Sequence, residues 1–218
     1  MTTEIPEREL QTTPEVGGMG HSVKRKEDPR FIRGQGEYID DVNLPGQLWL
    51  DIVRSPYAHA TIKSIDTSEA LKVPGVLAVI NGKDLEGYGL HWMPTLAGDR
   101  QMVLPTDTVM YQAQEVAAVI ATSRYAAADG VAAVLVDYDP LPVIVDPFKA
   151  LEDGAFVLRP DRAPDKQTNR IWHWESGDES KADAALAAAE VRIEEDIYIP
   201  RIHVASIETC GCVADWDP

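Results

Sequence analysis

Two cysteines, Cys210 and Cys212, are the softest donor residues of the chain and stand two positions apart. On a β-strand this spacing places both sulfurs on one face, and paired thiolates can bind Cu(I), zinc or an iron–sulfur cluster. Apart from His203, no further cysteine or histidine lies nearby at ligand spacing, so the set is too small to complete such a site. The pattern therefore favours small, buried residues of a core strand over a metal centre.

The remaining histidines and paired carboxylates do not form a recognisable catalytic pattern. The five histidines are scattered along the chain, at His21, His59, His91, His173 and His203. Each is predicted to be a surface or satisfied core residue. Asp40 and Asp41 are adjacent, and neighbouring strand residues point to opposite faces, so they are predicted to serve a turn or an edge.

Established catalytic motifs are missing from the sequence, which contains no HExxH, no pair of CxxC motifs, no P-loop and no GxSxG. Gly34-Gln35-Gly36 precedes an expected strand, whereas a dinucleotide-binding loop must follow a strand and open a helix. The sixth position of that fingerprint is Ile39. Residue spacing alone therefore predicts no catalytic, cofactor-binding or metal-ligating residue.

The elements that would position any site alternate between short strands and helices, which is typical of the mixed α/β (α+β) class. Alternating or continuous apolar runs predict strands at residues 48–53, 61–66, 76–80, 116–121, 135–138 and 143–145. The run at 76–80 is of the fully buried type. Helical segments are expected at 67–71, 83–85 and 124–135, whereas 86–108 is irregular and therefore a candidate functional or partner-bound loop.

A composition change at residues 159–170, which contain two prolines and almost no apolar side chain, predicts a linker. Beyond it, strands are expected at 171–174, 191–199 and 207–216, and a helix at 180–190. About fifty residues supply too little core to stand alone, so this part is expected to open a larger, truncated domain. The predicted organisation is a disordered tail at 1–20, a main domain at 21–160, and the linker with the first elements of a second domain at 161–218.

The charge balance is strongly acidic, with 36 Asp and Glu against 20 Lys and Arg, a net charge of −16. This argues against nucleic-acid and anionic membrane partners. No apolar run approaches the roughly 20 residues of a membrane helix, and the first twenty residues lack a signal-peptide core, so a cytoplasmic protein with reduced thiols is expected. The exception is a basic segment, residues 24–33, whose five cations predict internal pairing or a subunit contact.

Ordered motifs in residues 20–85 resemble the α/β-hammerhead domain of the xanthine-dehydrogenase-type molybdenum hydroxylases. The matching stretches are Arg33–Asp41, Leu44–Gly46, Val53–Ala60 and Pro74–Val76, with Tyr138–Pro142 further on. The likeness extends from about residue 20 to the end of the chain. It implies a hammerhead domain over 21–160, followed by the start of a molybdopterin-binding domain.

Three further segments, Leu90–Asp99, Tyr111–Ala117 and Ile207–Ala214, are most similar to the large subunits of the aerobic carbon monoxide dehydrogenases within that family. Gln112-Ala113-Gln114 stands where relatives acting on purines or aldehydes more often have Gly-Gln-Pro. Two alternatives remain: another molybdenum hydroxylase acting on an aldehyde or N-heterocycle, and a subunit-docking module without activity. In the docking alternative, residues 24–33 and 86–108 are the contact surfaces.

The resemblance implies oxidation of CO with water to CO2 at a molybdenum held by molybdopterin cytosine dinucleotide and bridged through sulfur to copper. Electrons would pass to 2Fe-2S clusters of a small subunit and FAD of a medium subunit, in a cytoplasmic dimer of heterotrimers, with peripheral association at the inner membrane face as an option. The family's copper-binding Ala-Tyr-Arg-Cys-Ser-Phe-Arg loop, its cofactor-binding glycine-rich loops and its glutamate near molybdenum are not in this sequence. Cys210 and Cys212 are therefore not assigned as copper ligands. No site residue is expected in this chain, which alone should be inactive and bind none of these cofactors.

Overall fold

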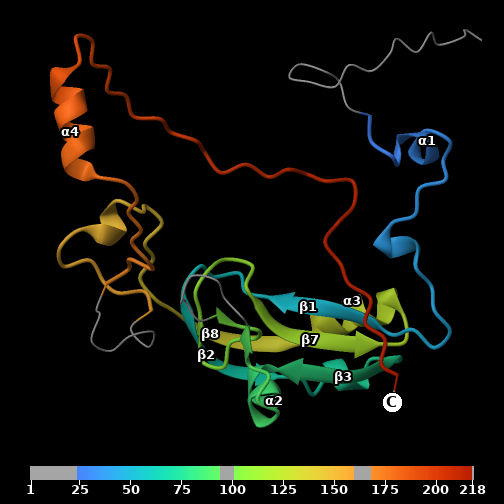
Figure 1. The fold of residues 1–218 in the computed structure, drawn as a ribbon. Helices are drawn as coiled ribbons and strands as arrows, with labels where there is room; N and C mark the ends of the chain where they lie inside the picture. The colour runs from blue at the N-terminus through green and yellow to red at the C-terminus, as the bar shows by residue number, and fades with distance from the viewer. Residues whose placement is uncertain (1–23, 94–100, 160–167, 218) are drawn as a thin grey trace, which may run out of the picture. The chain divides into compact units, whose positions relative to one another are not determined.

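The computed structural model describes residues 24–93, 101–159 and 168–217 (Figure 1). The chain divides into two compact units. One comprises residues 44–199, and the other joins residues up to 43 with residues from 200 onward. Each unit is described by itself.

A three-stranded antiparallel sheet in the order β1-β7-β3 forms the first layer of the larger unit. Its strands are β1 (Trp49–Arg54), β3 (Val76–Asn81) and β7 (Glu115–Ala121). The central strand β7 is buried along most of its length, as its continuous apolar run predicts. The edge strand β3 is only half-buried, with Leu77 55% exposed, so the prediction of a fully buried strand there is wrong.

A second antiparallel sheet has the order β6-β2-β8. It consists of β2 (Ala60–Asp66), β6 (Thr108–Val109) and β8 (Leu135–Pro140). The short strands β4 (Trp92–Met93) and β5 (Gln101–Met102) pair antiparallel with each other. The described part of residues 86–108 therefore contains one ordered strand pair as well as the irregular chain that the sequence predicts.

One helix, α3 (Arg124–Ala133), packs against β1 and β7. It begins after Ser123, whose hydroxyl oxygen accepts the backbone N–H of Ala126 at 3.1 Å and caps the first turn. Gly130 lies where α3 approaches the sheet most closely, since a Cβ there would be 2.7 Å from Cγ1 of Val119 and 2.8 Å from Cγ2 of Val76. Small residues on this face are thus what allow the helix to lie against the sheet.

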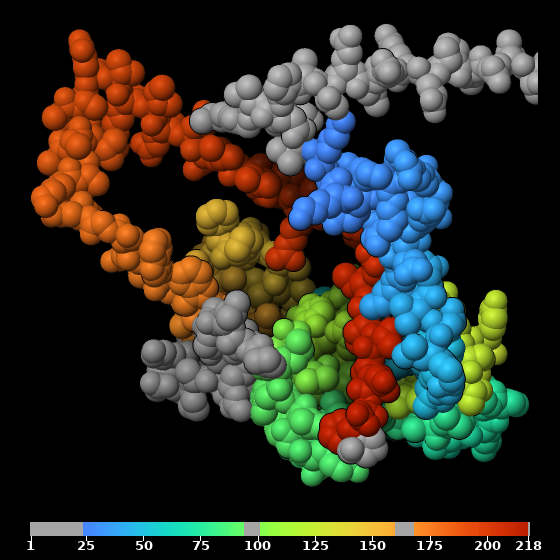
Figure 2. Space-filling model, turned by 45° about the vertical axis from the view of Figure 1, so that its right-hand side comes forward, coloured from blue at the N-terminus to red at the C-terminus, as the bar shows by residue number. Residues whose placement is uncertain are grey.

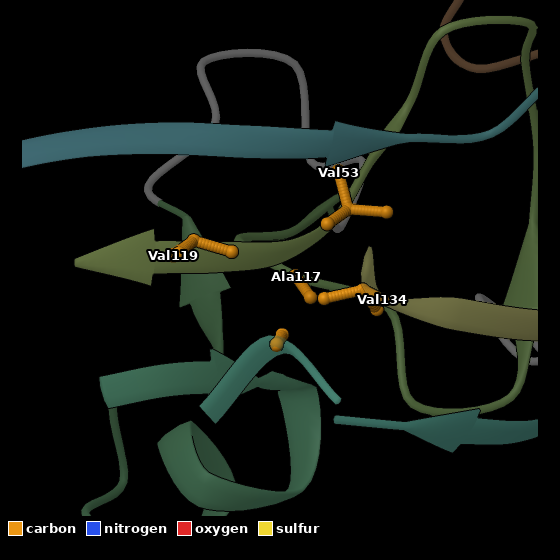
Figure 3. Packing of buried hydrophobic residues seen from close by; sticks show 5 residues of the cluster. Val53, Ala117, Val119 and Val134 are labelled. Atoms are coloured by element: carbon orange, nitrogen blue, oxygen red, sulfur yellow. The ribbon is translucent and has the colours of Figure 1, made fainter. Parts of the chain in front are cut away.

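The core is built from small and β-branched side chains. Figure 3 shows Val53 of β1, Ala117 and Val119 of β7, and Val134 gathered around one point. They pack with Ala70 of η2, a short 3₁₀ turn (Ala70–Lys72). Ile65 of β2 and Val136 of β8 pack against the same cluster, so one hydrophobic core joins the two sheets.

The remaining helical elements are short. They are α1 (Asp28–Phe31), η1 (Ile39–Asp41), α2 (Gly82–Gly87), η3 (Lys149–Leu151) and α4 (Glu179–Ala188). Helix α4 confirms the helix expected at 180–190, and α2 and α3 confirm those expected near 83 and 124. The helix expected at 67–71 is instead the 3₁₀ turn η2. In the described ranges, no helix has the length and apolarity of a membrane span.

Residues 171–217 are exposed throughout. Figure 2 shows the atoms of the stretch around α4, coloured orange, at the surface. The strands expected at 143–145, 171–174, 191–199 and 207–216 are wrong for this structure, because none of these residues pairs with another described strand. An alternating apolar pattern needs a hydrogen-bonded neighbour before it becomes a sheet, and Ile193 remains 85% exposed.

The helix, strand and turn content confirms the mixed α/β class expected from the sequence. Three expectations fall outside the described residues: the tail at 1–20, part of the loop at 86–108, and the centre of the linker at 159–170. The proposed domain limits at 1–20, 21–160 and 161–218 stay a prediction.

Candidate functional site

The cysteine pair is placed differently from the expectation of buried core residues. Cys210 and Cys212 are free and exposed, because no described strand pairs with the segment that carries them. His203 is exposed as well. Among the described residues, no group of three or more His, Cys, Asp and Glu side chains could hold a metal ion.

The first motif, Arg33–Asp41, folds into a compact pair of turns in the smaller unit. Gly34 has a φ of 69°, a left-handed conformation that favours glycine. Gly36 admits the ring of Phe31, since a Cβ there would lie 2.9 Å from its Cδ1. The ring of Phe31 in turn stacks on Tyr38, with centroids 6.0 Å apart. Gly34 therefore serves the turn geometry, and Gly36 allows the close approach of the Phe31 ring.

Asp40 and Asp41 lie in the 3₁₀ turn η1, not in a strand as the argument from alternating faces assumed. Oδ2 of Asp41 accepts the backbone N–H of Tyr38 at 2.9 Å, which confirms the predicted turn role. The next backbone N–H, that of Ile39, donates to Oε1 of Glu208 at 3.2 Å. Gly211 also meets Ile39, because a Cβ on Gly211 would lie 3.1 Å from Cγ2 of Ile39. Two motifs separated by most of the chain are therefore in contact within the smaller unit.

The second motif, Val53–Ala60, forms the turn after β1 and is organised by Ser55. This side chain is 2% exposed; its hydroxyl accepts the N–H of Tyr57 at 3.0 Å and donates to the Tyr57 carbonyl at 2.9 Å. Tyr57 packs against Tyr138 with ring centroids 5.3 Å apart. Burial raises the pKa of the Tyr138 phenol.

The same turn contacts the motif Tyr138–Pro142 through His59. The carbonyl of His59 accepts the N–H of Leu141 at 2.9 Å, and its Nδ1 lies 2.6 Å from the carbonyl oxygen of Pro142. Because a carbonyl only accepts, Nδ1 must carry the proton. The imidazole also stacks on Phe156 with centroids 6.1 Å apart. His59 is thus a satisfied structural histidine, as predicted, and it anchors the chain that follows β8.

The segment Tyr111–Ala117 meets Ser55 from the other side. The N–H of Ser55 donates to the Gln114 carbonyl, and the N–H of Ala113 donates to the Ser55 carbonyl, both at 2.9 Å. Ala113 has a φ of 67°, uncommon for a residue with a Cβ. The side chain of Gln114 is buried, and its Oε1 accepts the N–H of Met110 at 2.6 Å. Three motifs that the sequence shows only as separate segments therefore meet at the turn formed by residues 55–59.

An ion pair closes this junction. The guanidinium of Arg54 donates to Oε1 of Glu115 at 2.6 Å and to the carbonyl of Ala113 at 2.9 Å. Partial burial pushes the pKa of Glu115 upward, but hydrogen bonds from its own backbone N–H and from Arg54 outweigh this, so its pKa lies below the ordinary 4.5. Tyr111 donates to the same carboxylate at 3.2 Å, and burial followed by the Glu115 charge raises the pKa of that phenol.

Asn169, within the predicted linker, is a structural residue that sequence reasoning missed. Its side-chain oxygen accepts the N–H of Leu158 at 2.8 Å. Its amide nitrogen donates to the carbonyls of Ala150 and Phe156 at 3.0 and 2.9 Å. A lone asparagine in a polar stretch carries no sequence signal for such a role, because the three partners are backbone groups.

The other histidines are dispersed in the structure, as expected. Nε2 of His173 lies 2.6 Å from Oε1 of Glu175, and both side chains are exposed. His91 stacks at a tilt on Trp92, with centroids 5.4 Å apart. His21 and most of the segment Leu90–Asp99 lie outside the described residues.

The basic segment, residues 24–33, is exposed at nearly every position and contains α1. The guanidinium of Arg30 lies 5.2 Å from the ring centroid of Phe31. Within the described part of the chain, no ion pair involves the five cations of this segment.

Two family models cover most of the chain. Residues 33–142 match "Aldehyde oxidase and xanthine dehydrogenase, a/b hammerhead domain", and residues 162–218 match "Molybdopterin cofactor-binding domain". The first match spans half of the chain, and the chain therefore belongs to the aldehyde oxidase and xanthine dehydrogenase family. The expected hammerhead followed by the start of a molybdopterin-binding domain is confirmed.

Within this family the chain is similar to two proteins called "Carbon monoxide dehydrogenase large chain". That of Hydrogenophaga pseudoflava is 49% identical over 211 residues, 93% of this chain and 26% of the relative. That of Afipia carboxidovorans is 49% identical over 224 residues, 99% of this chain and 28% of the relative. The "Nicotine 6-hydroxylase large subunit" of Paenarthrobacter nicotinovorans is 37% identical over 91% of this chain and 24% of the relative. The chain thus spans about a quarter of the length of these relatives.

Solved structures give the same order of likeness. The reconstituted CO dehydrogenase from Oligotropha carboxidovorans superposes with a TM-score of 0.70 and 54% identity, over 80% of this chain and 23% of that one. Quinoline 2-oxidoreductase from Pseudomonas putida 86 gives a TM-score of 0.54 and 35% identity, over 62% and 18%. The resemblance to carbon monoxide dehydrogenase large subunits that the motifs indicate is confirmed by these identities.

Proposed function

We propose that this chain supplies the hammerhead and the opening part of the molybdopterin-binding region of an aerobic carbon monoxide dehydrogenase large subunit. The supporting observation is the difference in identity among relatives. The chain is 49% identical to two carbon monoxide dehydrogenase large chains, but 37% and 41% identical to subunits acting on nicotine and 6-hydroxypseudooxynicotine. The shared fold does not distinguish these enzymes, whereas the higher identity favours CO as the substrate.

The proposed reaction is CO + H2O → CO2 + 2H⁺ + 2e⁻, in which carbon is oxidised and the electrons leave through partner subunits. The complete subunit would hold molybdopterin cytosine dinucleotide with a molybdenum–copper centre, and soft Cu(I) suits CO as a ligand. A small subunit with 2Fe-2S clusters and a medium subunit with FAD would complete a heterotrimer that dimerises. The match of residues 162–218 to a molybdopterin-binding model supports the cofactor class.

This chain's own contribution is proposed to be structural, with no catalytic, cofactor-binding or metal-ligating residue among those described. Cys210 and Cys212 are free and exposed, and no third donor joins them among the residues that the structure describes, which supports this. Contacts with the iron–sulfur and flavin subunits would involve the basic segment and the chain around Tyr88 and Leu90, which are 81% and 63% exposed. The subunit would work in the cytoplasm, where its two thiols stay reduced.

The test uses the assembled enzyme. An affinity tag on this chain in its source organism should retrieve the complex, which is then supplied with ¹³CO and a dye acceptor under anaerobic conditions. We expect ¹³CO2 release with dye reduction, and molybdenum and copper in equal amounts by elemental analysis. Dye reduction by an aldehyde or an N-heterocycle, with none by CO, would refute CO as the substrate and favour the other molybdenum hydroxylases.

The purified 218-residue chain is the matched control. It should reduce no dye with CO and retain no molybdenum or copper after gel filtration. Turnover by this chain alone would show that it contains a catalytic site, contrary to the proposal.

A further inference from the structure

The turn η1 contacts the segment around Cys210-Gly211-Cys212. The proposed reaction does not require this contact, yet Glu208 and Gly211 both form it. Ile39 is the first residue of η1, and the first N–H groups of a helical turn have no acceptor inside the turn. Asp41 satisfies the N–H of Tyr38 at 2.9 Å. The N–H of Ile39 is satisfied by Glu208 at 3.2 Å, from 169 positions further along the chain.

Gly211 supplies a second, independent contact. Its φ is not among the left-handed values of the chain, so backbone conformation does not demand glycine here. Space does, because a Cβ would lie 3.1 Å from Cγ2 and 3.7 Å from Cδ1 of Ile39. The glycine between the two cysteines is therefore accounted for by the close approach of an isoleucine side chain.

We propose that η1 is a docking site for the segment Ile207–Cys212 of the same chain, with Glu208 and Gly211 as its positioning residues. The charge-assisted hydrogen bond from the Ile39 N–H to Glu208 sets which residue of the segment lies opposite η1. The missing Cβ of Gly211 sets how closely the segment approaches Ile39. Ile39 lies in the range of the hammerhead match and Gly211 in that of the molybdopterin-binding match, and both belong to the smaller unit, so the contact links two segments that lie far apart in the sequence. The role is independent of the substrate and is tested separately from the proposed function.

The contact predicts a specific pattern of amide exchange in the 218-residue chain. In Glu208→Ala, the exchange rate of the Ile39 amide, measured by nuclear magnetic resonance, should rise at least ~10-fold, because its acceptor is gone. Glu208→Gln keeps an acceptor oxygen and should stay within ~3-fold of the parent. Gly211→Ala should raise the rate ~3-fold or more by pushing the segment away from Ile39.

Matched controls separate docking from general effects. Glu195→Ala removes an exposed carboxylate of the same unpaired stretch, and Gly87→Ala adds a Cβ where nothing lies within 4 Å. Neither should change the Ile39 rate. Amides of β7 report the core and should exchange equally slowly in every variant. An unchanged Ile39 rate in Glu208→Ala, or an equal rise in Glu195→Ala, would overturn the proposal.

A measurement on the parent chain needs no substitution. With methyl-labelled isoleucine, a nuclear Overhauser effect should connect the Gly211 α-protons to a methyl group of Ile39. Its absence, in a sample whose β1–β7 cross-strand effects are present, would overturn the proposal as well.

Discussion

Replacing Gly130 with alanine has two opposing effects on the free energy of unfolding, a gain in helix propensity and a steric clash of the new Cβ. In the middle of α3, alanine is favoured over glycine by about 1 kcal/mol of helix propensity. The new Cβ would, however, lie 2.7 Å from Val119 and 2.8 Å from Val76. Val119 is fully buried and β-branched, so it can neither move outward nor change rotamer easily. Overpacking of this kind costs ~2–3 kcal/mol, and the expected net loss of stability is about 1–2 kcal/mol.

Urea unfolding followed by circular dichroism measures this difference in the free energy of unfolding. Ala128→Gly, at an exposed position of the same helix, is the control for propensity and should lose about 1 kcal/mol. A double-mutant cycle combines Gly130→Ala with Val76→Ala, which removes the methyl group that the new Cβ would contact. Gly130→Ala should then cost less than in the parent by ~0.5–1 kcal/mol, since the two residues are in contact.

The close packing of α3 on the sheet would be refuted by a Gly130→Ala chain that is as stable as the parent or more stable. Strict additivity with Val76→Ala would equally contradict it, because two side chains that touch should couple.

Three further predictions address the junction at the end of β1 and the exposed part of the chain. Ser55→Ala removes two hydrogen bonds from a buried turn and should lower the free energy of unfolding by about 1–2 kcal/mol in urea titrations, whereas exposed Ser68→Ala should lose less. Because the pKa of Glu115 is lowered in the folded state, this carboxylate contributes stability that is complete above pH 4.5 and is lost as the pH falls through the folded-state pKa. Glu115→Gln should therefore flatten the acid side of a plot of the free energy of unfolding against pH. An unchanged plot would contradict this. Limited trypsin digestion should cut residues 171–201 well before residues 44–140, because the first stretch is exposed throughout. Mass spectrometry of the early fragments measures the order of cleavage. Simultaneous cleavage of both ranges would contradict the exposure of residues 171–201.

Strongly patterned elements were predictable because local sequence and tertiary packing agree. The apolar run of β7 and the alanine-rich α3 follow directly from burial and helix propensity. The two-residue strands β4 and β6 were not predicted, since so short a segment carries no periodicity. Residues 191–199 show the opposite case: the alternation is clear, but a strand forms only against a partner.

Local roles of candidate residues were predictable from the sequence only in part. The sequence predicted Cys210 and Cys212 to be buried in a core strand, whereas both are exposed, because burial needs a partner strand that residue spacing does not reveal. The turn role of Asp41 was correct, although the residue lies in a 3₁₀ turn instead of a strand. The contact between Glu208 and Ile39 could not be found from spacing, because 169 positions separate residues whose types are unremarkable.

That separation has a consequence for synthesis of the protein. At roughly 5–20 residues per second, a ribosome needs about 8–34 s to progress from residue 39 to residue 208. The residues of helix α3 and its sheet are synthesised well before Glu208, so they can fold before the turn η1 has an acceptor for the Ile39 N–H. A nascent chain stalled after β8 should therefore have a protected core and a freely exchanging Ile39 amide.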